Sequence, residues 1–407
     1  MSDTPQYGSP LSPSPRPWHE LPLDGFPSPC FVVDETRLAA NLAVLDQVQR
    51  RTKAHVFLAL KGFAMFNVFP LLRRVLAGTC ASSPHEARMG REEFGGIVHS
   101  FAAGFSHDDI VDIVRYSDHL VFNSFDQYRR FRSLALAEAG GRKLDFGIRI
   151  NPEHSEGAVA IYNPCSPGSR LGVRPEAFAA EAVAGALEGI SGLHFHTLCQ
   201  QNADALARTV EAVEASFGKY LAGLKWINCG GGHHVSRADY NVDLLCDVLT
   251  RLHEKYGAQI IIEPGEAVAL NAGVLKCTVL DIVRADMDIA ILDTSAAAHM
   301  PDVLEMPYRP DLLDPEGNEA GLPGEKARTY RLAGKSCLAG DVIGEYSFDR
   351  QLNVGDVLLF LDMAHYSMVK TTTFNGLGLP AIAKITEDGE PVLVREFGYE
   401  EFRRRLS

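Results

Sequence analysis

The sequence lacks the features that mark membrane, secreted and nucleic-acid-binding proteins. No apolar run approaches the roughly 20 residues of a membrane-spanning helix, and no basic-then-apolar signal pattern opens the chain. The eight cysteines include no C-x-x-C pair, which favours a reduced, cytoplasmic protein over a disulfide framework. Lysine and arginine total 39 against 52 acidic residues, and the net charge of −13 argues against a nucleic-acid partner. We therefore expect a cytoplasmic globular protein that binds neither nucleic acid nor membrane.

What the chain does contain is a long alternation of apolar strand candidates and amphipathic helical patterns. The candidate strands are residues 55–60, 79–82, 97–101, 119–123, 145–150, 191–196, 226–229 and 259–263. The helical patterns are residues 35–51, 64–77, 108–116, 125–138, 176–188, 204–221 and 239–256. Eight strands that alternate with helices predict a (β/α)8 barrel of the TIM type, which is an α/β fold.

The pattern changes after residue 273. Strand candidates at 274–283, 288–293, 328–333, 356–361, 381–386 and 391–395 follow one another with little helical periodicity between them. We therefore predict a barrel domain over residues 18–273 and a β-rich C-terminal domain, a β-barrel or sandwich, over residues 274–407. The short strand at 31–33 is predicted to join the β-rich domain. Residues 1–17 are rich in serine and proline, which predicts a disordered tail.

Lys61 follows directly on the apolar run 55–60. In a barrel of this type the active site lies at the carboxyl ends of the strands, so a lysine there is a candidate functional residue. A desolvated lysine amine loses its proton and becomes a nucleophile that can form an imine with a carbonyl compound. The alternative is a lysine that extends to solvent or pairs with a carboxylate.

Three further strand ends carry residues with two interpretations each. Gly230, Gly231 and Gly232 can wrap a phosphate with bare backbone N–H groups, or can form a tight turn. Glu263 can hold a protonated ring nitrogen, or can be a structural ion-pair partner. His196 can stack on a planar cofactor, or can be a core histidine. A lysine for an imine, a phosphate cradle and an acid for a ring nitrogen together suggest pyridoxal phosphate.

A second cluster lies in the predicted β-rich domain. Cys337 is placed in the glycine-rich turn 334–341, where a thiol would be accessible, although a buried thiol is the alternative. The segments 362–367 and 373–376 follow it with further polar residues.

These residues resemble a known family, the fold type III pyridoxal phosphate-dependent decarboxylases, which include ornithine and diaminopimelate decarboxylases. The resemblance covers roughly residues 26–400. It is carried by the segments 59–61, 163–172 and 194–199, and by residues 299–310 (HMPDVLEMPYRP), which resemble the branch that acts on carboxynorspermidine.

The resemblance implies a role for each site residue. Lys61 would form the imine with the cofactor, His196 would stack on its ring and Glu263 would pair with its ring nitrogen. Gly230, Gly231 and Gly232, with Tyr366, would hold the phosphate. Cys337 would come from the partner subunit of a homodimer with shared active sites, and would return a proton to the substrate carbon. The candidates for binding the amines of a carboxylated polyamine substrate are Glu266, Asp302 and Asp341.

One position departs from the family. The ornithine and diaminopimelate enzymes have Glu-Pro-Gly-Arg, with the arginine on the phosphate, where this chain has Glu-Pro-Gly-Glu at 263–266. Either Glu266 turns toward a cationic substrate, or a nearby histidine such as His233 compensates. We expect decarboxylation of carboxynorspermidine, and of carboxyspermidine as a second substrate.

Three alternatives remain at the level of sequence. A decarboxylase of the same fold could act on diaminopimelate, ornithine or arginine. A regulator could keep the fold without activity, although the presence of both Lys61 and Cys337 counts against it. A metal-dependent hydrolase could use His194 and His196 with His233 or His234, since residues two apart on a strand face the same side. That third alternative leaves Lys61 and Glu263 unexplained, and our expectation is that no metal is bound.

Overall fold

The computed structural model describes residues 15–157 and 163–407, so that most of the predicted tail lies outside the described residues. The described residues form two compact units. One unit is Asn41–Leu270, and the other combines residues 15–40 with residues 271–407. Among the helices of the described ranges, none has both the length and the apolar character that crossing a bilayer requires.

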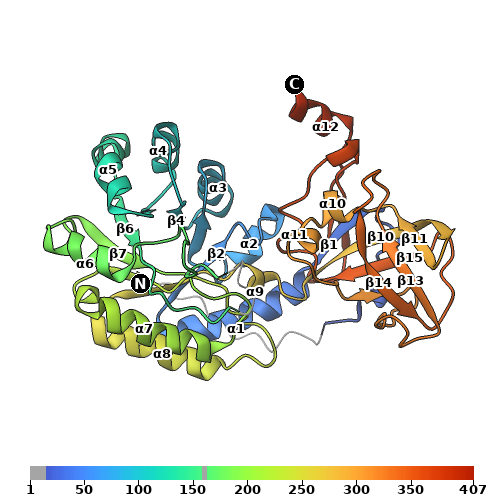
Figure 1. The fold of residues 1–407 in the computed structure, drawn as a ribbon, viewed down its shortest axis with the longest axis horizontal. Helices are drawn as coiled ribbons and strands as arrows, with labels where there is room; N and C mark the ends of the chain where they lie inside the picture. The colour runs from blue at the N-terminus through green and yellow to red at the C-terminus, as the bar shows by residue number, and fades with distance from the viewer. Residues whose placement is uncertain (1–14, 158–162) are drawn as a thin grey trace. The chain divides into compact units, whose positions relative to one another are not determined.

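The first unit is built around a closed barrel of parallel strands (Figure 1). The strands are β2 (His55–Ala59), β3 (Gly78–Ala81), β4 (Ile97–Phe101), β5 (His119–Phe122), β6 (Asp145–Arg149), β7 (Ile190–His194), β8 (Trp226–Asn228) and β9 (Gln259–Ile262). Each strand pairs with the next, and β9 pairs back with β2, so the described barrel has no open edge. The predicted (β/α)8 barrel is therefore confirmed.

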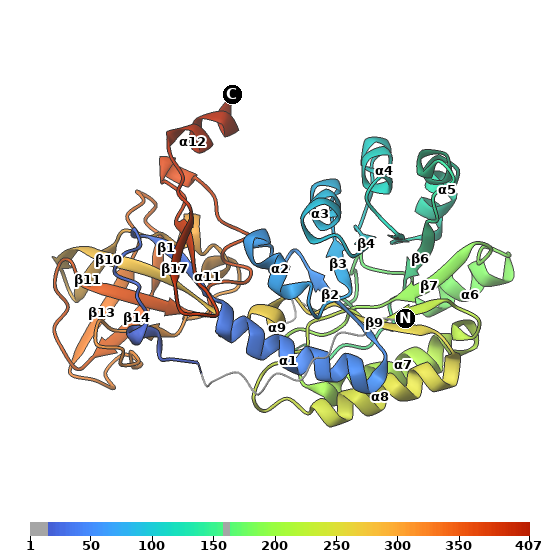
Figure 2. The same ribbon diagram turned by 180° about the vertical axis from the view of Figure 1, so that it is seen from behind.

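Helices connect the strands of this barrel. They are α1 (Glu35–Thr52), α2 (Phe69–Leu72), α3 (Pro84–Met89), α4 (His107–Val114), α5 (Phe125–Ala139), α6 (Pro175–Val183), α7 (Ala203–Leu221), α8 (Val242–Tyr256) and α9 (Glu266–Ala269). The long helices α7 and α8 lie side by side (Figures 1 and 2). Ser106 and Ser124 begin α4 and α5 by accepting hydrogen bonds from backbone N–H groups of the first turn.

The helix predicted at 64–77 is wrong in length. The structure has a 3₁₀ turn at Phe66–Val68 and then the short helix α2. Pro70 occupies the first turn of α2, and it has no backbone N–H to donate to the residues before it. A continuous helix through this point is therefore excluded.

The second unit is organised by one large mixed sheet. Its strands are β1 (Cys30–Asp34), β10 (Gly273–Arg284), β11 (Asp288–Leu292), β12 (Leu312–Leu313), β13 (Arg328–Ala333), β14 (Val342–Phe348), β15 (Val357–Leu361), β16 (Ala381–Ile385) and β17 (Pro391–Arg395). The main path runs β14-β13-β11-β10-β1-β16-β17, and β15 pairs with both β10 and β12. The short helices α10 (Ala296–His299) and α11 (Asp302–Glu305) follow β11, and α12 (Tyr399–Leu406) follows β17 (Figure 2).

Strand β1 belongs to this sheet although it precedes the barrel in the sequence. It lies antiparallel to β10 and parallel to β16. Its side chains alternate between two hydrophobic cores, with Phe31 in one and Cys30 and Val32 in the other. The predicted barrel domain began at residue 18, whereas the structure groups residues up to Ala40 with the sheet. The reason is the pairing of β1 on both of its edges.

Candidate active site

The barrel unit holds a cavity of about 250 Å³ at the carboxyl ends of its strands. Residues from β2, β3, β4, β6 and β7 line it, together with residues that follow β2 and β9. Lys61, His196 and Glu263 are among the lining residues. The prediction that these three residues lie together at the carboxyl ends of the strands therefore agrees with the structure.

Lys61 lies two residues beyond the end of β2 and lines the cavity wall. Its side chain is open to the cavity but lies well inside the barrel unit, so burial lowers the pKa of the Lys61 amine below 10.5. The positive charge of Arg149 lowers this pKa further, while Glu263 opposes the shift. A larger fraction of Lys61 is therefore the uncharged nucleophile than in a lysine exposed to water.

Arg149 is a site residue that the sequence reasoning missed. It ends β6 and is only 5% exposed, and its guanidinium carbon lies 4.7 Å from the ring centre of Phe101. Nη2 donates a hydrogen bond of 3.2 Å to the backbone oxygen of His196. Burial lowers the pKa of Arg149 to about 10. Arg149 could have been found, because it ends a strand as the other candidates do.

His196 has its ring fixed by the glycine run. The backbone N–H of Gly231 donates to Nδ1 of His196 at 2.9 Å. Nδ1 is therefore the acceptor, and the neutral ring carries its proton on Nε2. Burial lowers the pKa of His196 well below 6.5, and the positive charges of Lys61 and Arg149 lower it further. A neutral ring of fixed orientation in the cavity wall is suited to stacking on a planar cofactor.

Glu263 follows β9 and presents its carboxylate to the cavity. Nδ2 of Asn228 donates to Oε1 of Glu263 at 2.5 Å. His99 Nε2 lies 3.6 Å from Oε1, and His194 Nε2 lies 3.6 Å from Oε2. Asn228 and His99 were also missed by the sequence reasoning, since neither stands out within its own strand.

The three glycines pack against the backbone of neighbouring strand ends. A Cβ on Gly230, Gly231 or Gly232 would lie 2.4, 2.1 or 1.9 Å from a backbone oxygen. The backbone N–H groups of Gly230 and Gly231 donate to Asn228 and His196, so these two groups are already committed within the protein. The three glycines are therefore required for close packing of the backbone. The proposed phosphate contact depends on the N–H groups of Gly232 and of the residues after it.

We expect Gly231→Ala to destabilise the barrel and weaken cofactor binding. The added methyl group would lie 2.1 Å from the backbone oxygen of Glu263, so the loop must shift and lose its bond to His196. Overpacking of this kind costs about 1–3 kcal/mol. Thermal denaturation and titration with pyridoxal phosphate measure the two effects. Gly218→Ala in α7 is the control, because its methyl group meets only ordinary contacts, and an equal effect there would contradict the prediction.

Glu266 is held by two neighbours rather than by a phosphate-binding arginine. Nε2 of Gln200 donates to Oε1 at 2.9 Å, and Nε2 of His234 lies 2.9 Å from Oε2. His233 is buried and its Nδ1 lies 2.8 Å from the hydroxyl of Tyr240, so His234 rather than His233 contacts Glu266. That His233 compensates for the missing arginine stays a prediction.

The remaining candidates lie in the sheet unit. Asp302 is buried and accepts hydrogen bonds from Ser367 at 3.0 Å and from Tyr308 at 2.7 Å. Asp341 accepts from Ser295, at 2.8 Å, and from the backbone of the turn, so it fixes the turn that carries Cys337. Cys337 is exposed, and its backbone N–H donates to Asn375. Tyr366 is partly exposed and has a φ of +45°.

The structure thus brings one group of candidates together within the barrel unit: Lys61, His196, Gly230, Gly231, Gly232, Glu263 and Glu266. The second group, Asp302, Asp341, Cys337 and Tyr366, belongs to the sheet unit.

One further observation indicates that the barrel group can bind pyridoxal phosphate. His194 lines the cavity, is 2% exposed and has no hydrogen-bond partner for either ring nitrogen in the described chain, so a polar ligand would complete it.

The same histidines do not form a metal centre. No group of three histidine, cysteine or acidic side chains in residues 15–157 and 163–407 has the arrangement of a metal site. The hydrolase alternative therefore has no support in this geometry.

Comparisons with known proteins identify the family. A family model described as a pyridoxal-dependent decarboxylase, C-terminal sheet domain, matches residues 30–364. A carboxyaminopropylagmatine decarboxylase of Synechocystis is 45% identical, with 95% of this chain and 97% of that protein covered. A carboxynorspermidine/carboxyspermidine decarboxylase of Campylobacter jejuni is 39% identical over 93% of this chain and 98% of that protein.

A solved structure agrees with this result. The crystal structure of carboxynorspermidine decarboxylase from Campylobacter jejuni, complexed with norspermidine, superposes with a TM-score of 0.83 at 38% identity. The match covers 93% of this chain and 99% of the other. The chain therefore belongs to the pyridoxal-dependent decarboxylase family that includes the ornithine, diaminopimelate and arginine enzymes, and it is a decarboxylase that uses pyridoxal phosphate.

Proposed function

We propose that this decarboxylase acts on carboxynorspermidine, with carboxyspermidine as a second substrate, as a cytoplasmic homodimer with shared active sites. The observation that carries the substrate proposal is Glu266. The ornithine and diaminopimelate enzymes have an arginine at this position. This chain instead has a carboxylate that contacts Gln200 and His234. A negative charge there suits a substrate with several amines. The relatives from Campylobacter jejuni support the same substrate class.

Bound pyridoxal phosphate supplies an electron sink for the electrons that remain on the substrate Cα after carbon dioxide leaves. Lys61, with its lowered pKa, provides the uncharged amine that holds the cofactor aldehyde. The carboxylate of Glu263 keeps a proton on the ring nitrogen by charge stabilisation. The neutral ring of His196 would stack on the ring of the bound cofactor. Cys337 of the partner subunit donates the proton that replaces the carboxyl group.

A second substrate has one specific observation in its favour. The Synechocystis relative at 45% identity is a carboxyaminopropylagmatine decarboxylase, and the agmatine part of that substrate ends in a guanidinium. A planar guanidinium takes two parallel hydrogen bonds from one carboxylate, whereas an ammonium binds as a point charge. A carboxylate such as that of Glu266 can bind either cation.

Carbon dioxide release from matched substrates tests the proposal. The panel is carboxynorspermidine, carboxyspermidine, carboxyaminopropylagmatine, diaminopimelate and ornithine, each measured as kcat/KM on the loaded enzyme. We expect carboxynorspermidine to rank first and the two amino acids to be poor substrates. A preference for carboxyaminopropylagmatine would replace the proposal by its second candidate. A preference for diaminopimelate or ornithine would overturn both.

We expect Glu266→Gln to raise the KM for carboxynorspermidine about tenfold with little change in kcat, because a charged hydrogen bond to the substrate becomes a neutral one. Gln200 can still donate to the new amide oxygen, so the loop is preserved. Asp243→Asn is the control, since this exposed acid pairs with Arg51 on the outside of the barrel. An unchanged KM would remove Glu266 from substrate binding.

A further inference from the structure

A row of polar groups runs from the wall of the cavity through the interior of the barrel. Glu263 is linked to Asn228, Asn228 to His99, and His99 to His119. Barrels of this type normally fill this space with layers of branched apolar side chains. A buried polar group is costly unless it is hydrogen-bonded, so a connected polar row here is a feature that packing alone does not explain.

The direction of each hydrogen bond follows from one backbone contact. The N–H of Gly230 donates to Oδ1 of Asn228 at 2.8 Å, which fixes the orientation of the amide. Nδ2 of Asn228 therefore points the other way, and it donates to Oε1 of Glu263 at 2.5 Å and to Nε2 of His99 at 3.0 Å.

The proton positions on the two histidines are then determined. Nε2 of His99 accepts from Asn228, so His99 carries its proton on Nδ1. Nδ1 of His99 lies 3.1 Å from Nδ1 of His119, which must accept, so His119 carries its proton on Nε2. Burial lowers the pKa of His99 well below 6.5 and that of His119 to about 4. Both rings are therefore neutral at physiological pH.

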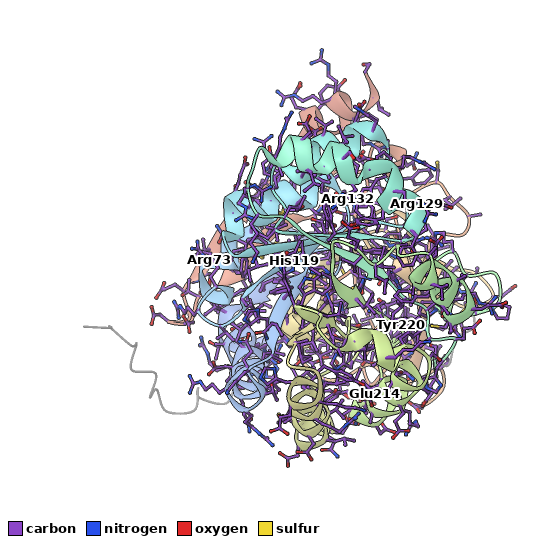
Figure 3. All side chains as sticks on the ribbon, turned by 90° about the vertical axis from the view of Figure 1, so that its left-hand side faces the viewer. Arg73, His119, Arg129, Arg132, Glu214 and Tyr220 are labelled. Atoms are coloured by element: carbon purple, nitrogen blue, oxygen red, sulfur yellow. The ribbon has the colours of Figure 1, made fainter. Side chains whose placement is uncertain are left out.

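The row connects opposite ends of the barrel. His119 is the first residue of β5, is partly accessible, and stacks on Trp226 with ring centres 5.3 Å apart. His99 lies in the middle of β4 and is fully buried, and Asn228 ends β8. Figure 3, which labels His119, shows it among the strands inside the helices.

We propose that His99 and His119 are positioning residues that act through Asn228 on Glu263, and that they direct one carboxylate oxygen toward the cofactor ring. Oε1 is fixed by Asn228, while Oε2 lies on the side of His194, whose ring nitrogens lack partners in the described chain. Because Asn228, His99 and His119 are neutral, they orient the carboxylate of Glu263 without neutralising it. The negative charge of Glu263 thus stays available for the ring nitrogen, which is the proposed role on which this inference rests.

The first test uses the protein without cofactor. In ¹⁵N spectra of histidine-labelled protein we expect His99 to carry its proton on Nδ1 and His119 on Nε2, with signals assigned from the His99→Gln and His119→Phe variants. Free imidazole side chains favour Nε2–H, so the expected state of His99 is distinctive. A proton on Nε2 of His99 would overturn the proposal.

The second test compares two ligands that differ at the ring nitrogen. The dissociation constants of pyridoxal phosphate and its 1-deaza analogue, which has carbon in place of that nitrogen, are measured for each variant. We expect His99→Leu to weaken pyridoxal phosphate about tenfold, as loss of such a supporting contact does, and to leave the analogue unchanged. His99→Gln, which can accept from Asn228 and donate to His119, should recover most of the loss. Equal weakening of both ligands, or of neither, would overturn the proposal.

Two further variants complete the design. Ser100 lies next to His99 in β4, and Ser100→Ala removes its buried hydrogen bond with Ser117. This control should change the dissociation constants of the two ligands by the same factor. Glu263→Gln should distinguish them at least as strongly as His99→Leu. If Glu263→Gln weakens both ligands equally, the proposed role of Glu263 is wrong. If Glu263→Gln weakens pyridoxal phosphate selectively and the His99 variants do not, only this inference is wrong. His119→Phe keeps the stacking on Trp226 and provides the same comparison if His99→Leu does not fold.

Discussion

Lys61→Ala is expected to abolish decarboxylation, with a loss of about 10⁴-fold or more, because Lys61 is the one lysine among the described residues that line the cavity. The absorbance band of the loaded enzyme at about 420 nm should disappear with it, since that band reports the imine between lysine and cofactor. The wild-type band should be removed by borohydride, and the variant should show only the spectrum of the free aldehyde. Absorbance spectra before and after borohydride measure both effects.

Lys143→Ala is the control for this experiment, because Lys143 is exposed and pairs with Asp145 on the outside of the barrel. It should keep both the band and the activity. A band that persists in Lys61→Ala would show that another residue holds the cofactor, and a wild-type band that survives borohydride would show that the cofactor is not held as an imine.

Cys337→Ala is expected to lower kcat about 10²- to 10⁴-fold while cofactor binding is kept, because it removes the proposed proton donor and no cofactor ligand. Cys337 is exposed in the described chain, so its loss leaves no cavity in the sheet unit. Steady-state kinetics and the absorbance band measure the two properties separately. Leu338→Ala, at the neighbouring position, which is also exposed, is the control.

Mixing the two inactive variants tests whether subunits share their sites. A mixed dimer of Lys61→Ala and Cys337→Ala would contain one site with both residues intact. Random exchange makes half of the dimers mixed, so about a quarter of wild-type activity should return. If activity does not return after subunit exchange, Lys61 and Cys337 act within one chain.

The barrel could be predicted because its strands are buried on both faces. Each appears as a short continuous apolar run, and eight such runs separated by helical patterns suit few other folds. Strand β14 was missed because Gly344 and Glu345 interrupt its apolar pattern. Its pairing with β13 and the burial of Ile343 and Tyr346 make it a strand. That information lies in other segments, so the residues of β14 alone do not contain it.

The predicted site residues follow the ends of strands, but Arg149 and Asn228, which also end strands, were missed together with His99 inside the barrel. Lys61, His196 and Glu263 were found because parallel strands bring their carboxyl ends to one edge. His99 is one polar residue in an apolar strand, which a single strand does not distinguish from a core histidine. Its hydrogen bonds appear only when β4, β5 and β8 place three polar side chains against each other.

The pairing of β1 gives the chain a fixed order of assembly. Cys30 emerges early in synthesis, but its sheet partners Lys276 and Ala381 are made only after the whole barrel sequence has been synthesised. Domains generally fold as they are completed. The barrel is therefore the part that can form first. The sheet forms last, when β10 and β16 pair with β1, which was synthesised before the barrel. A fragment that starts at residue 271 would lack β1, which lies between β10 and β16. The edge of β10 and the edge of β16 that pair with β1 would then be exposed.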